Sequence, residues 1–297
     1  MKHIFIINPI AGKKDSTRLI PVIEKQFTSN DDYQIIVTEQ IGHATQIATT
    51  YQKEDDVCLY AIGGDGTAFE ILNGLNDGVS MAVIPNGTGN DYFRMINYQS
   101  DDIEQILIDT INGKTVLVDY GMANDRRYLN SSSMGVDADV NDLANKIGAK
   151  YPIPKSMVYI VAAIITIFNV KPIDIDMILD GKEIKKHALL IAVMNGKYYG
   201  GGFLPTPMAD IQDGLFNICV VENMKFSRIV KVLPKYFKGE HIGIPEISFY
   251  QANTAILNTP NEVLYGCDGE TKYATNIEYR LFKKALSLRV PQGSTLL

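Results

Sequence analysis

Two glycine-rich segments carry the residues with the most evident chemistry, GGDGT at 63–67 and PNGTGND at 85–91. Each contains one threonine and one aspartate, namely Thr67 and Asp65 in the first, Thr88 and Asp91 in the second. Glycine has no Cβ, so phosphate oxygens can approach the main chain, and the threonine hydroxyls add hydrogen-bond donors. The aspartates would repel a bare phosphate but suit Mg²⁺ lying between carboxylate and phosphate. Two helix caps with turn glycines are the alternative, and the repetition of the pattern favours a phosphate site.

Two further carboxylate pairs occur later in the chain. Asp210 and Asp213 stand three residues apart before Gly214, and this close spacing of oxygen ligands with a turn glycine suits a hard cation. The same residues could instead form a polar turn that leads into a strand. Asp268 and Glu270 follow an apolar run in YGCDGE, and the residues alone predict a hairpin turn there.

The first part of the chain alternates between strand-like and helix-like segments. Strands are predicted at 3–8, 33–39, 56–64 and 80–87. Helices are predicted at 15–27, 43–54, 67–75, 91–98 and 101–112. This alternation predicts a parallel sheet covered on both faces. Both glycine-rich segments follow strands and precede helices, which is where parallel sheets bind ligands and where helix N-termini attract anions.

After about residue 122 the strand-like runs follow one another, and Asp180-Gly181 predicts a hairpin between two of them. We therefore expect a largely antiparallel sandwich or barrel. Two helices are predicted within it, over 156–169 and about 225–238. The last strand-like run, 285–290, could return to the first domain.

Composition narrows the function classes. The chain has 297 residues, of which 46% are hydrophobic, and a net charge of −6, so nothing predicts a nucleic-acid partner. Its three cysteines lie far apart and without metal-site spacing, which favours a reducing compartment. The longest apolar run, 157–168, is shorter than the roughly 20 residues that span a bilayer, and is interpreted as a buried helix. We expect a cytoplasmic protein.

Several motifs, in the same order, resemble the diacylglycerol kinase catalytic-domain family, and the bacterial soluble enzymes in particular. They are GGDGT, IPNGTGNDYFR at 84–94, YYGGGFLPTPMADIQDGLF at 198–216, DGE at 268–270, and Asn8-Pro9 after the first strand. The resemblance implies an NAD-kinase-like α/β nucleotide-binding domain over residues 1–122, to which 285–297 return. It also implies a larger, mostly antiparallel β-sandwich domain over 123–284, with the active site in the cleft.

The resemblance also implies roles for individual residues. The nucleotide is expected at Asn8, Thr38, Gly64, Asp65, Gly66, Thr67, Gly87 and Thr88. The catalytic residues are expected to be Asp268 as general base, Glu270 beside it, and Asp65, Asp91 and Arg94. A structural Mg²⁺ is expected on Asp210, Asp213 and the carbonyl of Leu215.

These implications predict an ATP- and Mg²⁺-dependent kinase that converts diacylglycerol to phosphatidic acid. Another lipid acceptor, such as phosphatidylglycerol or a sphingoid base, remains an alternative within the family. NAD kinase shares the GGDG loop, although NGTGND and DGE favour the lipid-kinase branch. The oligomeric state is not encoded in any motif, and a homodimer stays open.

A kinase of membrane lipids must reach the bilayer surface, so peripheral membrane association is expected. The segment KFSRIVKVLPKYFKG at 225–239 has basic residues on one predicted helical face and no acidic residue. Those residues are Lys225, Arg228, Lys231, Lys235 and Lys238. A basic amphipathic helix can lie on anionic lipid, whereas an ordinary surface helix packed on the sandwich is the alternative. Pro234 predicts a break or kink within it.

Overall fold

The computed structural model describes residues 1–12, 15–29, 32–135, 143 and 171–296, so the helix predicted over 156–169 lies outside the described residues. The chain divides into two compact units. Unit 1 consists of Met1–Tyr120, Ile211–Asp213 and Phe282–Leu297. Unit 2 consists of Gly121–Asp210 and Gly214–Leu281. No helix in the described part of the chain is both long and apolar enough to cross a membrane.

Unit 1 is built on a parallel sheet with the strand order β2-β1-β3-β4. The strands are β1 (Lys2–Ile7), β2 (Tyr33–Val37), β3 (Val57–Gly63) and β4 (Ser80–Pro85). Residues Ser287–Arg289, near the end of β13, pair in parallel with β4. The predicted parallel α/β architecture is confirmed. Because helices cover this sheet, β3 is buried along its whole length, which explains its unbroken apolar run.

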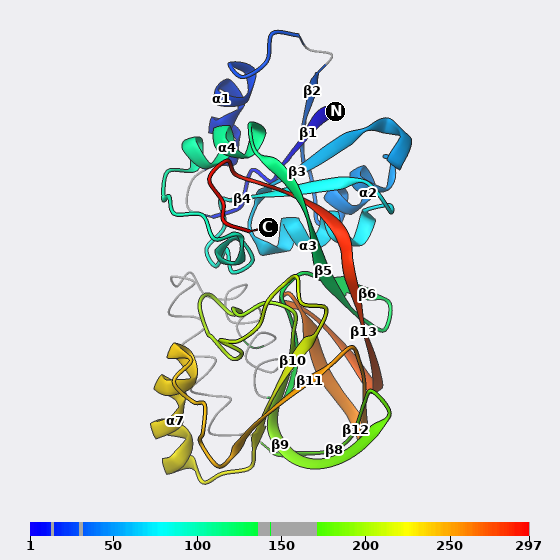
Figure 1. Ribbon diagram of the computed structural model, residues 1–297, viewed down its shortest axis with the longest axis vertical. Coiled ribbons are helices and arrows are strands. Elements are labelled where there is room, and N and C mark those ends of the chain that lie inside the picture. Colours follow the sequence, from blue (N-terminus) through cyan, green and yellow to red (C-terminus); the bar gives the residue numbers. More distant parts are fainter. Residues whose placement is uncertain (13–14, 30–31, 136–142, 144–170, 297) are drawn as a thin grey trace. The chain divides into compact units, whose positions relative to one another are not determined.

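The helices of unit 1 pack as two pairs, α1 with α4 and α2 with α3 (Figure 1). The elements are η1 (Ser16–Leu19), α1 (Ile20–Glu24), α2 (His43–Thr49), η2 (Lys53–Asp55), α3 (Asp65–Gly74), η3 (Phe93–Ile96) and α4 (Ile103–Ile111). Since crossover connections are right-handed, the strand order places α1 on one face of the sheet and α2 and α3 on the other. The helix predicted over 91–98 is only the 3-10 turn η3, because Asn97 adopts a left-handed conformation and ends it.

Unit 2 is mainly antiparallel, as predicted, with the order β11-β10-β9-β7-β12-β13 and with β8 pairing both β9 and β12. Its strands include β6 (Arg126–Tyr128), β7 (Ser131–Gly135), β8 (Ile173–Leu179), β9 (Lys182–Met194), β10 (Phe216–Glu222), β11 (Ile247–Ala252) and β12 (Thr254–Cys267). β5 (Lys114–Ala123) and β13 (Glu270–Val290) each contribute residues to both units. The predicted Asp180-Gly181 hairpin is confirmed, with φ of 45° and 84° at its two turn residues.

One helix of unit 2, α7 (Phe226–Lys238), packs on the sheet through Val232 and Tyr236. It runs without interruption through Pro234, so the predicted break is wrong. Proline removes one N–H from a helix. Here Pro234 is exposed, so water can satisfy the carbonyl group that loses its donor, and only one further turn follows it.

Candidate functional site

The two glycine-rich segments lie against each other at the carboxyl ends of β3 and β4. A Cβ on Gly87 would stand 2.4 Å from the Gly64 Cα, and a Cβ on Gly64 would stand 3.2 Å from the Gly87 Cα. Cβ contacts below about 3 Å are sterically excluded, so at least Gly87 has to be glycine for the two main chains to touch. These two glycines therefore have a packing role within the protein, independent of any ligand.

Gly66 is different, because no atom of the described residues occupies the space where its side chain would be. A Cβ there would meet no atom within 4 Å, and the residue is exposed in the first turn of α3. The N-terminus of a helix carries a partial positive charge and presents N–H groups that suit a phosphate. Glycine at this position leaves the main chain open to an approaching anion, which fits the predicted nucleotide-phosphate role.

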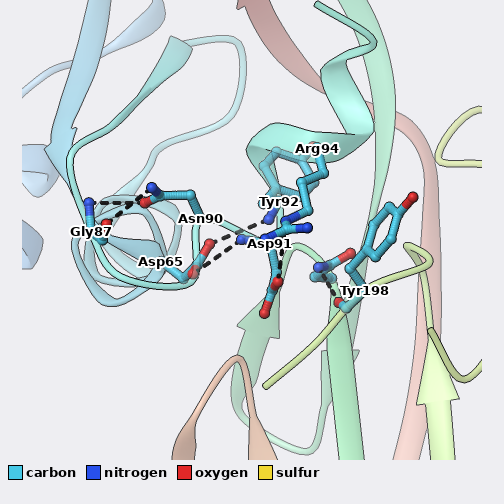
Figure 2. A network of polar contacts seen from close by, with 8 residues as sticks. Asp65, Gly87, Asn90, Asp91, Tyr92, Arg94 and Tyr198 are labelled. Carbon is cyan, nitrogen blue, oxygen red and sulfur yellow. Dashed lines mark hydrogen bonds and ion pairs between the residues drawn. The ribbon is translucent and has the colours of Figure 1, made fainter. Parts of the chain in front are cut away.

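Asp65 holds the second loop in place through its carboxylate (Figure 2). The Asp91 main-chain N–H donates to Oδ2 at 3.2 Å, and the Tyr92 N–H donates to Oδ1 at 3.3 Å. Burial raises the pKa of the Asp65 carboxyl, and the main-chain hydrogen bonds oppose that shift. A partly buried carboxylate that accepts from these two N–H groups thus links the two loops.

The second loop is also closed upon itself. Asn90 accepts from the Gly87 N–H at 2.9 Å and donates from Nδ2 to the Gly87 carbonyl at 3.1 Å, with a left-handed φ of 52° (Figure 2). The next residue, Asp91, is buried, and its Oδ1 lies 3.7 Å from Nε of the half-exposed Arg94. The loop therefore presents a guanidinium group to solvent beside a buried carboxylate, and Thr88 is exposed on the same loop.

A pocket of about 200 Å³ opens where β1, β2 and α3 meet. Its polar lining consists of Asn8, Thr38, Glu39, Gln40, Thr67 and Glu70. Asn8 donates from Nδ2 to Thr67 Oγ1 at 3.2 Å, which joins the end of β1 to the first turn of α3. Three residues that the family resemblance assigns to the nucleotide, Asn8, Thr38 and Thr67, thus line one pocket.

Asp268 belongs to unit 2, where its carboxylate holds a neighbouring segment of main chain. It accepts from the N–H groups of Leu129, Asn130 and Ser131 at 2.5, 3.1 and 2.9 Å. Its own N–H donates to the Ser131 carbonyl at 2.9 Å, and its φ is 44°. At least three of about four lone-pair sites of the carboxylate are therefore used within the protein. Glu270 is exposed at the start of β13.

The residues predicted to hold a structural cation lie in the segment before β10. Asp210 is exposed, Asp213 and Leu215 are partly buried, and Gly214 has a left-handed φ of 79°. The described residues contain no group of three or more His, Cys, Asp or Glu side chains that could hold a metal ion. Mg²⁺ keeps several waters and commonly binds proteins through one or two carboxylates, so two aspartates and a carbonyl are a chemically adequate donor set.

Two polar residues that support the site were not predicted from the sequence. Asn86 is buried, accepts from both terminal nitrogens of Arg18 at 3.2 Å, and donates to Ser16 Oγ at 2.6 Å. Glu70 accepts from the Ala44 N–H at 3.1 Å and so ties α3 to the start of α2 beside the pocket. Their partners are 26 to 70 residues away in the chain, where no local pattern reveals them.

Comparison with known proteins assigns both parts of the chain. A model of the diacylglycerol kinase catalytic domain matches residues 2–123, and a model of the YegS C-terminal NAD kinase beta sandwich-like domain matches residues 130–290. A diacylglycerol kinase from Bacillus subtilis is 25% identical over 91% of this chain and 90% of its own length. One from Mycobacterium tuberculosis is 28% identical over 83% of this chain and 80% of its own length.

A solved structure agrees with these matches. The crystal structure of a proposed diacylglycerol kinase from Bacillus anthracis superimposes with a TM-score of 0.79 at 26% identity, covering 99% of this chain and 98% of that one. The fold predicted from the sequence is thereby confirmed. The two family models match the two halves of the chain in order. The chain therefore belongs to the family in which a diacylglycerol kinase catalytic domain is followed by a YegS C-terminal NAD kinase beta sandwich-like domain.

Proposed function

We propose that this lipid kinase uses ATP and Mg²⁺ to phosphorylate the hydroxyl of diacylglycerol, giving phosphatidic acid. The observation that carries the proposal is the open main chain at Gly66, in the first turn of α3, on the helix whose Thr67 and Glu70 line the pocket at the ends of β1 and β2. The names of the relatives support diacylglycerol as the acceptor.

In the proposed reaction, the acceptor hydroxyl oxygen forms a bond to the γ-phosphorus while the bond from phosphorus to the ADP oxygen breaks. The proton of the acceptor hydroxyl passes to the Asp268 carboxylate. A carboxylate is a weak base for an alcohol, so the proton moves late, in a loose transition state where positioning matters more than basicity. In unit 1, α3 and the Gly66 main chain bind phosphate, and Arg94 offers a cation near the loop that Asp65 holds.

Mg²⁺ would neutralise phosphate charge, with Asp65 and Asp91 as its carboxylate neighbours. A second Mg²⁺ would stabilise the fold at Asp210, Asp213 and the Leu215 carbonyl. These assignments rest on the donor chemistry and on the resemblance of the motifs.

The test is phosphate transfer from γ-labelled ATP by the purified protein, with dispersed diacylglycerol, phosphatidylglycerol, sphingosine and NAD offered separately. We expect labelled phosphatidic acid. Preferential labelling of another lipid would move the acceptor assignment within the family, and labelled NADP would replace the proposal with NAD kinase.

The Gly66→Ala variant is expected to lose ATP affinity without losing stability. The added Cβ occupies the space reserved for phosphate, so we expect KM for ATP to rise about tenfold or more, equivalent to ~1.4 kcal/mol. Alanine favours helix over glycine by about 1 kcal/mol, so the melting temperature should not fall. The matched control Gly87→Ala places a Cβ 2.4 Å from Gly64 and should melt earlier. An unchanged KM in Gly66→Ala would remove this main chain from the phosphate site.

The Asp213→Ala variant is expected to lose a stabilising Mg²⁺. A ligand present at about 100 times its Kd stabilises the folded state by ~2.7 kcal/mol, so chelation should lower the melting temperature of the wild type by several degrees. The variant should melt at the lower temperature with or without chelator. Glu183 is an exposed acidic residue on β9, and its replacement in Glu183→Ala serves as the control. The melting temperature of this control should still fall when the metal is chelated. An unchanged melting temperature of the wild type after chelation would refute a structural Mg²⁺.

A further inference from the structure

The segment 129–131, which donates three main-chain N–H groups to Asp268, is also held by the residue that follows β9. That residue is Asn195, and its main-chain N–H donates to the Asn130 carbonyl at 3.0 Å. Its side-chain Nδ2 donates to the Leu129 carbonyl at 2.7 Å. Both the donors and the acceptors of this segment are therefore engaged, which gives it a fixed place in unit 2.

The side chain of Asn130 extends this network to a motif that the proposed reaction leaves without a role. Asn130 is 4% exposed, its main-chain N–H donates to Asp268 Oδ1 at 3.1 Å, and its Nδ2 donates to the Tyr198 carbonyl. Tyr198 begins the motif YYGGG, whose three glycines have φ between 60° and 117°. Glycines stiffen a chain little, so a buried anchor before them fixes where this motif begins.

The bonding of the Asn130 carboxamide shows which of its atoms the position requires. Its Oδ1 is buried and has no hydrogen-bond donor among the described residues. Burying an acceptor without a donor costs free energy, and a leucine of nearly the same size would avoid that cost. The Nδ2 donor, rather than the size of the side chain, therefore accounts for asparagine at this position.

We propose that Asn130 is a positioning residue for Asp268, the base of the proposed reaction. Its side chain anchors the segment 129–131 to Tyr198, and the segment in turn holds both oxygens of the Asp268 carboxylate. Asn130 can act in this way without touching a reacting atom, because misplacing a catalytic group by about 1 Å can lower a rate 10²-fold. The inference rests on the proposed function, since it takes Asp268 as the group that receives the acceptor proton.

The first test compares the kinetics of Asn130→Ala and Asn130→Leu with those of wild type on dispersed diacylglycerol. We expect both variants to lose about tenfold or more of kcat, because neither has a donor for the Tyr198 carbonyl. KM for ATP should stay close to that of wild type, since the pocket expected to hold the nucleotide belongs to unit 1. Leucine nearly fills the space of asparagine, so a wild-type kcat in Asn130→Leu would overturn the proposal.

Asn217→Ala is the matched control for loss of a buried carboxamide in unit 2. Asn217 is 2% exposed on β10, and its Oδ1 accepts from Gln251 Nε2 at 3.2 Å. Its Nδ2 has no acceptor among the described residues, so this side chain too has one bonded and one unpaired polar atom. We expect the control to melt earlier than wild type and to keep its kcat. Equal losses of kcat in Asn217→Ala and Asn130→Ala would overturn the proposal.

A double-variant cycle shows whether Asn130 acts through Asp268. Asp268→Asn removes the proposed base, so adding Asn130→Ala to it should lower kcat by no more than about twofold further. A merely structural effect of Asn130 would multiply the loss instead. A further tenfold loss, of about the size seen in the wild-type background, would therefore overturn the positioning role.

Thermal unfolding of the same variants tests the link between the two residues without any turnover. Because both side chains support one segment, the melting temperature of the double variant should fall by less than the two single falls together. Fully additive falls would overturn the inference, whether or not the enzyme is active. If wild type transferred phosphate to no lipid, the proposed function would fail, and a less than additive fall would still show that Asn130 positions the Asp268 carboxylate.

Discussion

The Asp268→Asn variant should turn over diacylglycerol about 10²-fold or more slowly than wild type, with KM for ATP little changed. An amide cannot take the proton of the attacking hydroxyl, so the loss falls on the chemical step. Steady-state kinetics on dispersed acceptor would measure it. If the variant kept more than about a tenth of the wild-type rate, Asp268 would serve only to hold main chain, and another carboxylate would have to receive the proton.

The same substitution is expected to lower stability, although asparagine is nearly isosteric with aspartate. One oxygen of Asp268 accepts from Asn130 and Ser131, and the other accepts from Leu129. An amide offers one oxygen, so its NH₂ group must face at least one of these N–H donors. Leaving a buried donor unpaired costs about 1–3 kcal/mol, which thermal unfolding would detect.

A control variant separates this structural loss from the chemical one. Ser132→Ala removes a buried hydroxyl that lies 3.1 Å from the Tyr279 hydroxyl, next to the segment that Asp268 holds. It should cost about 1 kcal/mol of stability while leaving the carboxylate in place, so its kcat should remain close to that of wild type. A comparable collapse of kcat in Ser132→Ala would show that Asp268→Asn acts through the fold.

Much of unit 1 was predictable because its fold imposes a local pattern. Strands buried on both faces must be apolar throughout, and parallel strands need long crossover connections that are usually helices, so β1, β3 and β4 could be identified from the sequence. The error at 91–98 has a tertiary cause. Asp65, distant in sequence, accepts from the Asp91 and Tyr92 N–H groups and fixes where this segment lies, and the left-handed Asn97 ends the segment after a single 3-10 turn.

The two glycine-rich loops of the candidate site could be placed at strand ends from the sequence, but their internal bonding could not be predicted. Glycines at strand ends mark the loops, yet their spacing does not distinguish Gly87, which packs on Gly64, from Gly66, which faces open space. The hydrogen bond from the Leu129 N–H to the Asp268 carboxylate joins residues 139 apart in sequence. Such contacts depend on how distant strands pair, which is decided by the whole sheet rather than by neighbouring residues.

The Asp65→Asn variant should lose about 10²-fold or more of kcat/KM for ATP. The amide cannot accept from both Asp91 and Tyr92, so the loop that carries Arg94 shifts, and misplacement by about 1 Å can cost 10²-fold. In the proposed site, where Asp65 neighbours the nucleotide phosphates, loss of its negative charge would add to this effect. The control Asp77→Asn, an exposed residue of the same unit, makes the same charge change and should behave as wild type. If Asp65→Asn kept a kcat/KM near that of wild type at ordinary Mg²⁺ concentrations, the proposed catalytic role of Asp65 would be refuted.

Stability measured against pH gives an independent test of Asp65. Burial raises the pKa of its carboxyl, so in the acid range the folded state binds this proton more tightly than the unfolded chain does. The unfolded state then binds fewer protons, and the contribution of Asp65 to the free energy of unfolding falls as pH rises through that raised pKa. The Asn variant lacks this loss. Its melting temperature, relative to that of wild type, should therefore be highest at neutral pH and should fall as the pH is lowered. If the melting temperatures of wild type and variant differed by the same amount at every pH from acid to neutral, the Asp65 carboxylate would not be desolvated. Its hydrogen bonds to the second loop would then be exposed to solvent.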